Sequence, residues 1–231
     1  MFRFKQFSVD DAGCAMKVGT DSVLLGSWTS VADAISIADL GAGSGLLSLM
    51  LAQRSHQAHI SAVEIDSDAC RAASANIQAS PWSHRIKVVN ADVMTHSFDD
   101  PLDLIITNPP YFIGGLVSPD AARATARTAC IFSPLAAIAI ADRWLTPEGT
   151  LAMVVPTEMT DDIIFEAEMH RMQPWRQCDV IQVDGRKPTR TLWQIARKSS
   201  GRKPERSSVT IRDISSSLTS QFVNLTREFY L

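Results

Sequence analysis

The segment from residue 39 to residue 45 has the composition of a cofactor-binding turn. It reads Asp39-Leu40-Gly41-Ala42-Gly43-Ser44-Gly45 and links a strand-like run to a helical pattern. Glycines at such a junction let the backbone turn sharply and let a ligand approach without meeting a Cβ atom. The alternate glycines also fit a dinucleotide-binding turn, although that fingerprint has the form GxGxxG. We therefore expect Asp39, Gly41, Gly43 and Gly45 to belong to a cofactor site.

Two acidic residues stand where the next two strand-like runs end. Glu64 closes the run 59–64, and Asp92 follows the run 86–90. A carboxylate at the tip of the second strand can accept hydrogen bonds from both ribose hydroxyls, and Glu64 would repel a 2′-phosphate. Asp92 is placed to accept a hydrogen bond from an adenine amino group. Together with the glycine turn, these acids predict a site for a nucleoside-containing cofactor.

The segment after the fourth strand-like run decides the chemistry that we expect. It reads Asn108-Pro109-Pro110-Tyr111, and here the sequence resembles class I methyltransferases that act on planar amino nitrogens. In that group the asparagine amide and the carbonyl of the first proline accept hydrogen bonds from the target NH₂, and the aromatic ring stacks on the target base. The resemblance implies a catalytic set of Asn108, Pro109, Pro110 and Tyr111, with S-adenosylmethionine as the methyl donor and Asn108 next to it.

The chemistry of a conjugated amine supports these roles. The lone pair of an adenine amino group is delocalised into the ring, which makes the nitrogen a poor nucleophile. Two fixed acceptors can draw the nitrogen toward tetrahedral geometry and orient its lone pair at the methyl group. Proline keeps the backbone rigid and removes competing N–H donors. No strong general base is required, because the proton can leave after methyl transfer.

Other functions fit parts of the same pattern. A protein glutamine N5-methyltransferase would present a carboxamide NH₂ of the same conjugated geometry to Asn108 and Pro109. A DNA adenine-N6 methyltransferase would have to flip its base out of a duplex, and the sequence contains no large target-recognition segment. A nicotinamide dehydrogenase would use the glycine turn but leaves the segment 108–111 unexplained. A non-catalytic RNA-binding protein would not need so complete a set of site residues.

Positive charge is concentrated in the C-terminal third of the chain. The net charge of the whole chain is −3, which argues against coating of nucleic acid through bulk charge. Between Arg171 and Arg212, however, there are eleven Lys and Arg residues and three acidic residues, which favours a local anionic partner. We expect Arg186, Lys187 and Arg190, in a turn between two strand-like runs, to hold phosphates of that partner.

The N-terminal residues narrow the resemblance to one family. Segments 4–7, 16–21 and 24–28 look like the N-terminal signature of bacterial tRNA(Val) adenine-37 N6-methyltransferases, and segments 80–82, 126–127 and 228–231 are similar to that family too. The match runs over nearly the whole chain, although the basic segment 198–208 is longer than usual. The resemblance implies an adenine of the tRNA anticodon loop as target. We also expect Thr20 to close over the methionine end of the cofactor.

The elements that must position these residues predict an α/β fold. Strand-like runs at 35–40, 59–64, 86–90, 102–107 and 150–155 alternate with helical patterns at 45–54, 67–79, 133–145 and 158–172, with Ser67 and Ser133 as N-caps. This order predicts right-handed βαβ units in a doubly wound, mostly parallel sheet. The runs 175–184 and 191–197 have no helix between them and predict a C-terminal antiparallel hairpin. The family resemblance implies the Rossmann-like class I S-adenosylmethionine methyltransferase fold.

We expect one domain over residues 1–231, in three parts. Residues 1–34 form an N-terminal cap with an edge strand, residues 35–198 the Rossmann-like core, and residues 199–231 a basic, mobile loop and a terminal helix over 219–230. The basic C-terminal segment would add contacts to tRNA. The four cysteines have no CxxC or zinc-ligand spacing, so we expect free thiols and no metal. The chain lacks a signal-peptide pattern and a run of 18 apolar residues, which predicts a cytoplasmic protein.

Overall fold

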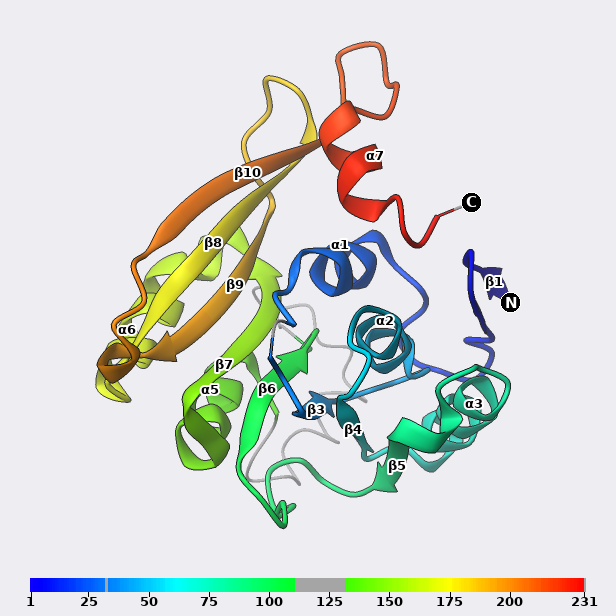
Figure 1. The fold of residues 1–231 in the computed structure, drawn as a ribbon. Helices are drawn as coiled ribbons and strands as arrows, with labels where there is room; N and C mark the ends of the chain where they lie inside the picture. Colours follow the sequence, from blue (N-terminus) through cyan, green and yellow to red (C-terminus); the bar gives the residue numbers. More distant parts are fainter. Residues whose placement is uncertain (32, 111–131, 231) are drawn as a thin grey trace, which may run out of the picture.

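The computed structural model describes residues 1–31, 33–110 and 132–230. Its main strands are β3 (Ser36–Leu40), β4 (His59–Glu64), β5 (Ile86–Asn90), β6 (Leu102–Thr107), β7 (Leu145–Pro156), β8 (Met172–Val183), β9 (Arg190–Arg197) and β10 (Glu205–Arg212). They form one sheet in the order β10-β8-β9-β7-β6-β3-β4-β5 (Figure 1). Strands β5, β4, β3, β6 and β7 are parallel, and β9 runs antiparallel to both β7 and β8. The predicted parallel sheet with a C-terminal antiparallel hairpin is confirmed.

Helices cover both faces of this sheet. They are α1 (Thr20–Trp28), α2 (Leu46–Arg54), α3 (Ser67–Gln78), α5 (Pro134–Trp144), α6 (Thr160–Met169) and α7 (Ser220–Thr226). One core lies between the sheet and α1, α2, α3 and α7, and the other lies between the sheet and α5 and α6 (Figure 1). The central strands are buried on both sides, and this explains their nearly continuous Ile, Leu, Val and Ala runs. The buried faces hold the carboxyl ends of the strands in fixed positions.

Of the two N-caps predicted from the sequence, one is confirmed and the other is wrong. Ser133 caps α5 as predicted, because its side chain accepts a hydrogen bond from the Ala136 N–H. The cap of α3 is Asp66 rather than Ser67: its carboxylate accepts hydrogen bonds from the N–H groups of Asp68 and Ala69. An acidic cap also interacts favourably with the helix dipole, which a serine hydroxyl does much less.

The predicted mobile loop over 199–208 is wrong in its second half. Residues from Glu205 onward form β10, which pairs in parallel with β8 from Glu205 and Arg176 to Arg212 and Val183. In β10 the alternate residues Val209 and Ile211 are buried, whereas the strand's first four residues are exposed. Two apolar residues next to a polar, basic stretch are too weak a period-two signal to find from sequence alone. The terminal helix α7 is also shorter than predicted and has Thr219 as its N-cap.

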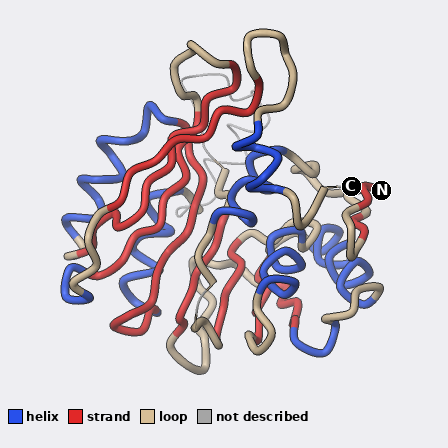
Figure 2. The backbone as a smooth tube through the Cα atoms, turned by 45° about the horizontal axis from the view of Figure 1, so that its top comes forward, coloured by secondary structure: helices blue, strands red, loops and turns tan. Residues whose placement is uncertain are grey.

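The N-terminal residues do not extend the main sheet as an edge strand. Strands β1 (Phe2–Arg3) and β2 (Ser8–Val9) pair with each other in a separate two-stranded sheet. The rings of Phe4 and Phe7 stack with centroids 4.6 Å apart, and the Phe4 ring also lies 6.1 Å from that of Tyr230. The two ends of the chain therefore lie side by side (Figure 2).

The thiols of Cys14, Cys70 and Cys178 are free and buried, while Cys130 lies outside the described residues. Within the described ranges, no three His, Cys, Asp or Glu side chains are grouped so that they could hold a metal ion. None of the helices in these ranges has the length and apolar character that crossing a bilayer requires.

Candidate active site

The carboxyl ends of β3, β4, β5 and β6 bring the predicted site segments to one edge of the sheet. They surround a cavity of about 270 Å³, close to the lower end of the range of about 300–1,000 Å³ in which small-molecule sites fall. Its lining residues are Ala15, Met16, Gly41, Gly43, Glu64, Ile65, Asp66, Ala69, Asp92, Val93, Asn108, Pro110 and Phe132. This is the edge where open α/β sheets bind their ligands.

The glycines of the turn have different structural roles: two line the cavity, and the third allows close helix packing. Gly43 has a φ of +54°, and a Cβ built on it would meet no atom within 4 Å, so its backbone faces open space. Gly45 has a φ of +79°, and a Cβ there would lie 3.4 Å from Ala73 and Ile77. Gly41 and Gly43 line the cavity, whereas Gly45 permits the close packing of α2 on α3. The structure thus does not bring Gly45 into contact with the cavity.

Glu64 is the buried carboxylate at the tip of β4, with 8% of its surface exposed. Its Oε2 accepts a hydrogen bond from the Gly43 N–H at 2.8 Å, and its Oε1 accepts one from the Asp66 N–H at 2.9 Å. These bonds fix the carboxylate against the glycine turn. Each oxygen keeps a second lone pair, so Glu64 can still accept a hydrogen bond from a hydroxyl group of a ligand.

Asp92 lies on the other side of the cavity, after β5. Its Oδ1 accepts a hydrogen bond from the Met94 N–H at 2.9 Å, and its carbonyl accepts one from the His96 N–H. The side chain is therefore held by the turn that follows it, with the carboxylate at the cavity wall. This geometry suits an acceptor for a ligand N–H group.

Asp39 lies beneath the turn rather than in the cavity wall. Its Oδ2 accepts hydrogen bonds from the Ser48 N–H at 3.0 Å and the Ser48 Oγ–H at 2.7 Å, while its Oδ1 is buried and unpaired among the described residues. Burial raises the pKa of the Asp39 carboxyl to about 7. Asp39 joins the turn to α2, and the structure does not bring it into the cavity lining with Glu64 and Asp92.

Asn108 follows β6 and has one free acceptor. Its Nδ2 donates a hydrogen bond to the Ser22 Oγ at 3.0 Å and one to the Met16 Sδ at 3.3 Å. Its Oδ1 is buried and accepts no hydrogen bond from the described residues. An unpaired buried acceptor costs about 1–3 kcal/mol, so an incoming NH₂ group that donates to this oxygen would be favoured. Pro109 is buried, Pro110 lines the cavity, and Tyr111 lies outside the described residues.

The residues that line the cavity suit S-adenosylmethionine in charge. Three carboxylates line it, those of Glu64, Asp66 and Asp92, and no Lys or Arg does so among the described residues. This lining suits a ligand with a sulfonium, an amino group and ribose hydroxyls, and it does not suit the phosphates of a dinucleotide. Ile65 and Val93 supply apolar surface of the kind that a purine ring contacts.

Comparison with known proteins identifies the family. The model of the Methyltransferase small domain matches residues 14–179. A relative from Tolumonas auensis, named tRNA1(Val) (adenine(37)-N6)-methyltransferase, is 44% identical, and the alignment covers 100% of this chain and 96% of the relative. Relatives with the same name from Aeromonas hydrophila and Bacteroides thetaiotaomicron are each 41% identical, with 100% of this chain and 97% of each relative covered. The chain belongs to the tRNA1(Val) (adenine(37)-N6)-methyltransferase family.

Solved structures support the fold of this family member. A predicted O-methyltransferase from Agrobacterium tumefaciens has a TM-score of 0.70 at 22% identity, covering 90% of this chain and 96% of that chain. A Listeria monocytogenes protein described as a class I S-adenosylmethionine-dependent methyltransferase has a TM-score of 0.59 at 17% identity, covering 89% of this chain and 65% of that chain. The class I fold predicted from the sequence is confirmed, and family and fold together imply S-adenosylmethionine as methyl donor.

Thr20 is a predicted cofactor residue that does not line the cavity. It is exposed and lines a different surface hollow, together with Gln182, Arg212 and Tyr230. Thr20 is the first residue of α1, and it is Ser22, one position beyond its neighbour Asp21, that contacts Asn108. The role of Thr20 toward the cofactor stays a prediction, and among these neighbouring residues it is Ser22 that contacts the candidate site.

Sequence reasoning missed several apolar residues of the cavity. Met16 and Phe132 come from segments before α1 and before α5, and only folding brings them to the glycine turn. A Cβ built on Gly41 would lie 3.6 Å from the Phe132 ring. Ile65 is 64% exposed directly after Glu64. The sequence signal that could have found Ile65 is a large apolar residue directly after the acid that closes a strand-like run.

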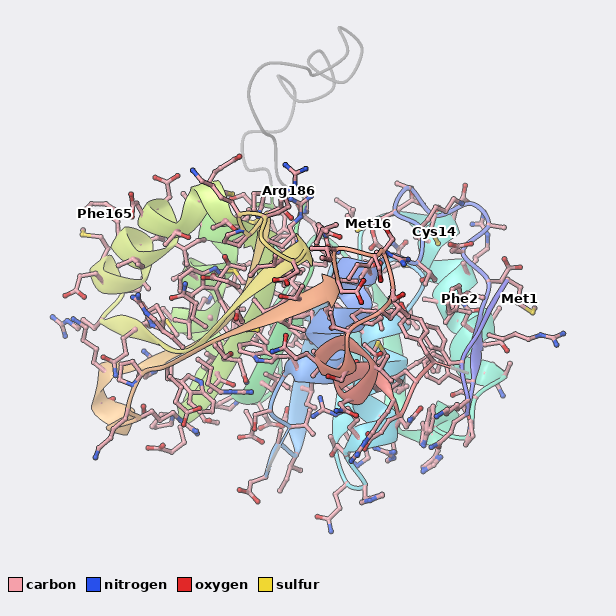
Figure 3. All side chains as sticks on the ribbon, turned by 90° about the horizontal axis from the view of Figure 1, so that it is seen from above. Met1, Phe2, Cys14, Met16, Phe165 and Arg186 are labelled. Carbon is pink, nitrogen blue, oxygen red and sulfur yellow. The ribbon has the colours of Figure 1, made fainter. Side chains whose placement is uncertain are left out.

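The turn between β8 and β9 lies at the same edge of the sheet as Asn108. This follows from the register, because Arg190 at the start of β9 pairs with Pro156 at the end of β7. Arg186 and Lys187 are exposed in this turn, and Figure 3 shows Arg186 and Met16 along the same side of the molecule. Arg190 differs from them: its Nε donates to the Asp21 Oδ2 at 3.0 Å.

The basic residues between β9 and the first half of β10 lie at the opposite edge of the sheet, whereas Arg212, at the end of β10, pairs with Val183 next to the β8–β9 turn. Arg197, at the end of β9, forms an ion pair with Asp142 at 2.6 Å, and Lys198 pairs with Glu168. The Arg202 guanidinium lies over the Trp175 ring, 4.7 Å from its centroid. The structure thus does not bring Lys198 or Arg202 to the candidate active site. The excess of basic residues read from the sequence is divided between two edges and partly neutralised.

Proposed function

We propose that this chain transfers the methyl group of S-adenosylmethionine to N6 of adenine 37 in tRNA1(Val). Membership of the family supports the reaction and the substrate. The observation that carries the proposal within the site is the Asn108 amide, whose buried Oδ1 has no hydrogen-bond donor among the described residues. An amino group is the donor that this acceptor lacks, and transfer to an amino nitrogen is the reaction of the family.

The cofactor would lie in the cavity at the ends of β3, β4 and β5. When bound, S-adenosylmethionine supplies an electrophilic methyl group. Glu64 would accept hydrogen bonds from the ribose hydroxyls, and Asp92 would accept one from the adenine amino group. Gly41 and Gly43 would allow close approach, while Asp39 and Gly45 would hold the turn in shape. Thr20 is omitted from this set because it faces a different part of the surface.

The target amine would be held by residues that follow β6. The Asn108 Oδ1 and the Pro109 carbonyl would accept its two hydrogens, so that the nitrogen lone pair points at the methyl group. Pro110 would keep the segment rigid, and Tyr111 would stack on the target base. The N6 proton would leave after transfer, which requires no strong base in the cavity.

The tRNA would be held by the turn between β8 and β9. The exposed cations Arg186 and Lys187 are suited to backbone phosphates of the anticodon loop, whose bases are already partly unstacked. Arg190 would act through its ion pair with Asp21, which connects the turn to α1. We further propose a single domain over residues 1–231 and a cytoplasmic location, where tRNA is found.

Glutamine in a protein is the second candidate target. Its carboxamide NH₂ is planar and conjugated, so the Asn108 and Pro109 acceptors would suit it equally well. The exposed cations of the β8–β9 turn favour RNA instead, because they lie at the edge where the target must enter.

The test of this function uses tritiated S-adenosylmethionine and four substrates. These are an unmodified tRNA1(Val) transcript, the same transcript with guanine in place of adenine 37, a duplex DNA, and a protein with an exposed glutamine loop. Label that appears only in the first transcript and is recovered as N6-methyladenosine supports the proposal. Label in both transcripts rejects position 37, and label in the protein alone moves the target to glutamine.

The role of Asn108 gives a sharper prediction. The Asn108→Ala substitution should lower kcat by about 10²–10³-fold, because it removes an acceptor aimed at the reacting amine. The Kd of S-adenosylhomocysteine, measured by calorimetry, should change by less than about twofold, since Glu64 and Asp92 remain. Near-normal turnover would exclude Asn108 from the reaction, and a large loss of cofactor affinity would make it a cofactor residue.

A further inference from the structure

The amide of Asn108 can face the site in two ways, and only one of them serves the reaction. In the observed orientation Nδ2 donates to Ser22 and Met16, and no donor among the described residues pairs with Oδ1. In the reversed orientation Nδ2 would take the place of the free acceptor and repel the incoming NH₂ group. Catalysis on an amino nitrogen therefore needs a device that selects the first orientation.

The two partners of the Nδ2 group are unequal in this selection. The Ser22 hydroxyl can either donate or accept, so it would form a hydrogen bond with the amide in both orientations. The Met16 thioether has no proton and can only accept. Reversal would place Oδ1 against the Met16 sulfur, where no hydrogen bond is possible. Met16 thus decides the orientation, and Ser22 fixes the plane of the amide.

The element that carries Ser22 is suited to positioning. Ser22 is 8% exposed in the first turn of α1, and this helix packs against α2, α7 and β7. The adjacent Asp21 is held by Arg190 of β9, with both side chains about one quarter exposed. The hydroxyl is therefore presented from a rigid scaffold, as a supporting residue of a catalytic group must be.

We propose that Ser22 and Met16 are positioning residues that hold the Asn108 amide with Oδ1 toward the target amine. Neither residue needs to contact the amine. This inference rests on the proposed function for its catalytic meaning, whereas the restraint on the amide is a property of the chain itself. The two can therefore be tested apart.

The first experiment needs no reaction. In protein labelled with ¹⁵N-asparagine, the Asn108 side-chain NH₂ signal is assigned by its loss in Asn108→Asp, and its hydrogen exchange is measured by NMR. Ser22→Ala and Met16→Leu should each speed this exchange by about tenfold or more, because each removes one acceptor. Ser22→Thr keeps the hydroxyl and should leave the rate within about twofold of the wild-type rate. Unchanged exchange in both Ser22→Ala and Met16→Leu would overturn the restraint.

The second experiment measures turnover of tRNA at saturating cofactor. Ser22→Ala should lower kcat by about tenfold and leave the Kd of S-adenosylhomocysteine within about twofold, with kcat restored in Ser22→Thr. Met16→Leu should also lower kcat by about tenfold. A kcat loss that comes with an equal loss of cofactor affinity or of folding stability contradicts positioning, and so does an unchanged kcat. If the wild-type protein methylates no tRNA, the proposed function fails, while the exchange experiment still decides the restraint.

Discussion

Asp39 is a carboxyl group that the fold keeps away from water. Burial raises its pKa to about 7, although Ser48 donates two hydrogen bonds to its Oδ2. In the unfolded chain an aspartate loses its proton near pH 4. Between these two values the folded protein binds more protons than the unfolded one, so this group destabilises the folded state progressively as pH rises.

The Asp39→Asn substitution should remove this pH dependence. The amide keeps an oxygen that can accept hydrogen bonds from Ser48, and it stays neutral at every pH. The free energy of unfolding of the wild-type protein, relative to the variant, should fall by up to about 1.4 kcal/mol for each pH unit from pH 5 to pH 7 and then level off. Urea unfolding at four pH values measures this difference. A constant difference across the range would contradict a raised pKa at Asp39.

Asn76 of α3 connects the N-terminal segment to the glycine turn. Its Oδ1 accepts a hydrogen bond from the Asp10 N–H at 2.8 Å, and its Nδ2 donates to the carbonyls of Asp10 and Ser44 at 2.9 Å each. The side chain is 7% exposed. One asparagine thereby holds two segments that both reach the cavity.

The Asn76→Ala substitution should lower the free energy of unfolding by about 1–3 kcal/mol, because it leaves the buried Ser44 carbonyl without this hydrogen bond. It should also weaken S-adenosylhomocysteine binding, since Ser44 belongs to the turn. Urea unfolding and calorimetry measure the two effects. The matched control is Gln78→Ala on the same helix, where the side chain is exposed. Equal effects of both substitutions would show that α3 is merely sensitive to any change.

The site residues were predictable to the extent that they follow a strand in sequence. Glu64, Asp92 and Asn108 directly follow or close apolar runs, so their place at the cavity could be read from the chain. Met16 and Ser22 could not be read in this way, because their contact with Asn108 joins positions far apart in sequence. For Asp39 the sequence gives the place in the turn, but it does not give the direction of the side chain, which lies toward Ser48.

At the scale of the elements, the turn between β8 and β9 is the predicted contact with tRNA. The double substitution Arg186→Glu with Lys187→Glu should weaken tRNA binding by about tenfold or more, because two cations at the entrance become anions. The Kd of S-adenosylhomocysteine should stay within about twofold. Filter binding of the tRNA1(Val) transcript at fixed salt measures the first effect.

The control for this experiment has the same change of charge at the other edge of the sheet. Lys203 and Arg206 are exposed near the start of β10, far from the end of β7 where the site lies. Lys203→Glu with Arg206→Glu should leave tRNA affinity nearly unchanged. If both double variants bind tRNA equally weakly, net charge rather than the β8–β9 turn determines the affinity.

The elements themselves were predictable in the parallel half of the sheet. There β4, β5 and β6 have the predicted bounds, because buried strands are apolar on both faces and each is followed by a helix or turn. Strand β10 escaped prediction because its pairing partner β8 supplies most of its hydrogen bonds and only Val209 and Ile211 are buried. The pairing of β1 with β2 was not predictable for a similar reason, because it is supported by aromatic contacts with Tyr230 near the C-terminus.

At the scale of the whole molecule, an aromatic cluster joins the two ends of the chain. Phe229 is 1% exposed, its ring lies 6.5 Å from that of Phe4, and its carbonyl accepts a hydrogen bond from the Lys5 N–H at 2.9 Å. The cluster supports the N-terminal segment on its way to the cavity.

The Phe229→Ala substitution should lower the free energy of unfolding by about 3–5 kcal/mol through loss of this buried ring. Because Met16 belongs to the supported segment, S-adenosylhomocysteine affinity should fall as well. Urea unfolding and calorimetry at a temperature where the variant remains folded measure both. Full cofactor affinity in the destabilised variant would show that the cluster supports the fold without supporting the site.

Because Phe2 and Tyr230 lie close together, the order in which the elements follow one another along the chain could be changed. The rings of Phe2 and Tyr230 lie 6.0 Å apart, so a short glycine-rich linker could join the two ends without moving either. New ends could be opened in the exposed stretch around Gly201, at the edge of the sheet away from the cavity. Such a circular permutant would begin with β10 and α7. Its Asn108 would lie far in sequence from both new ends.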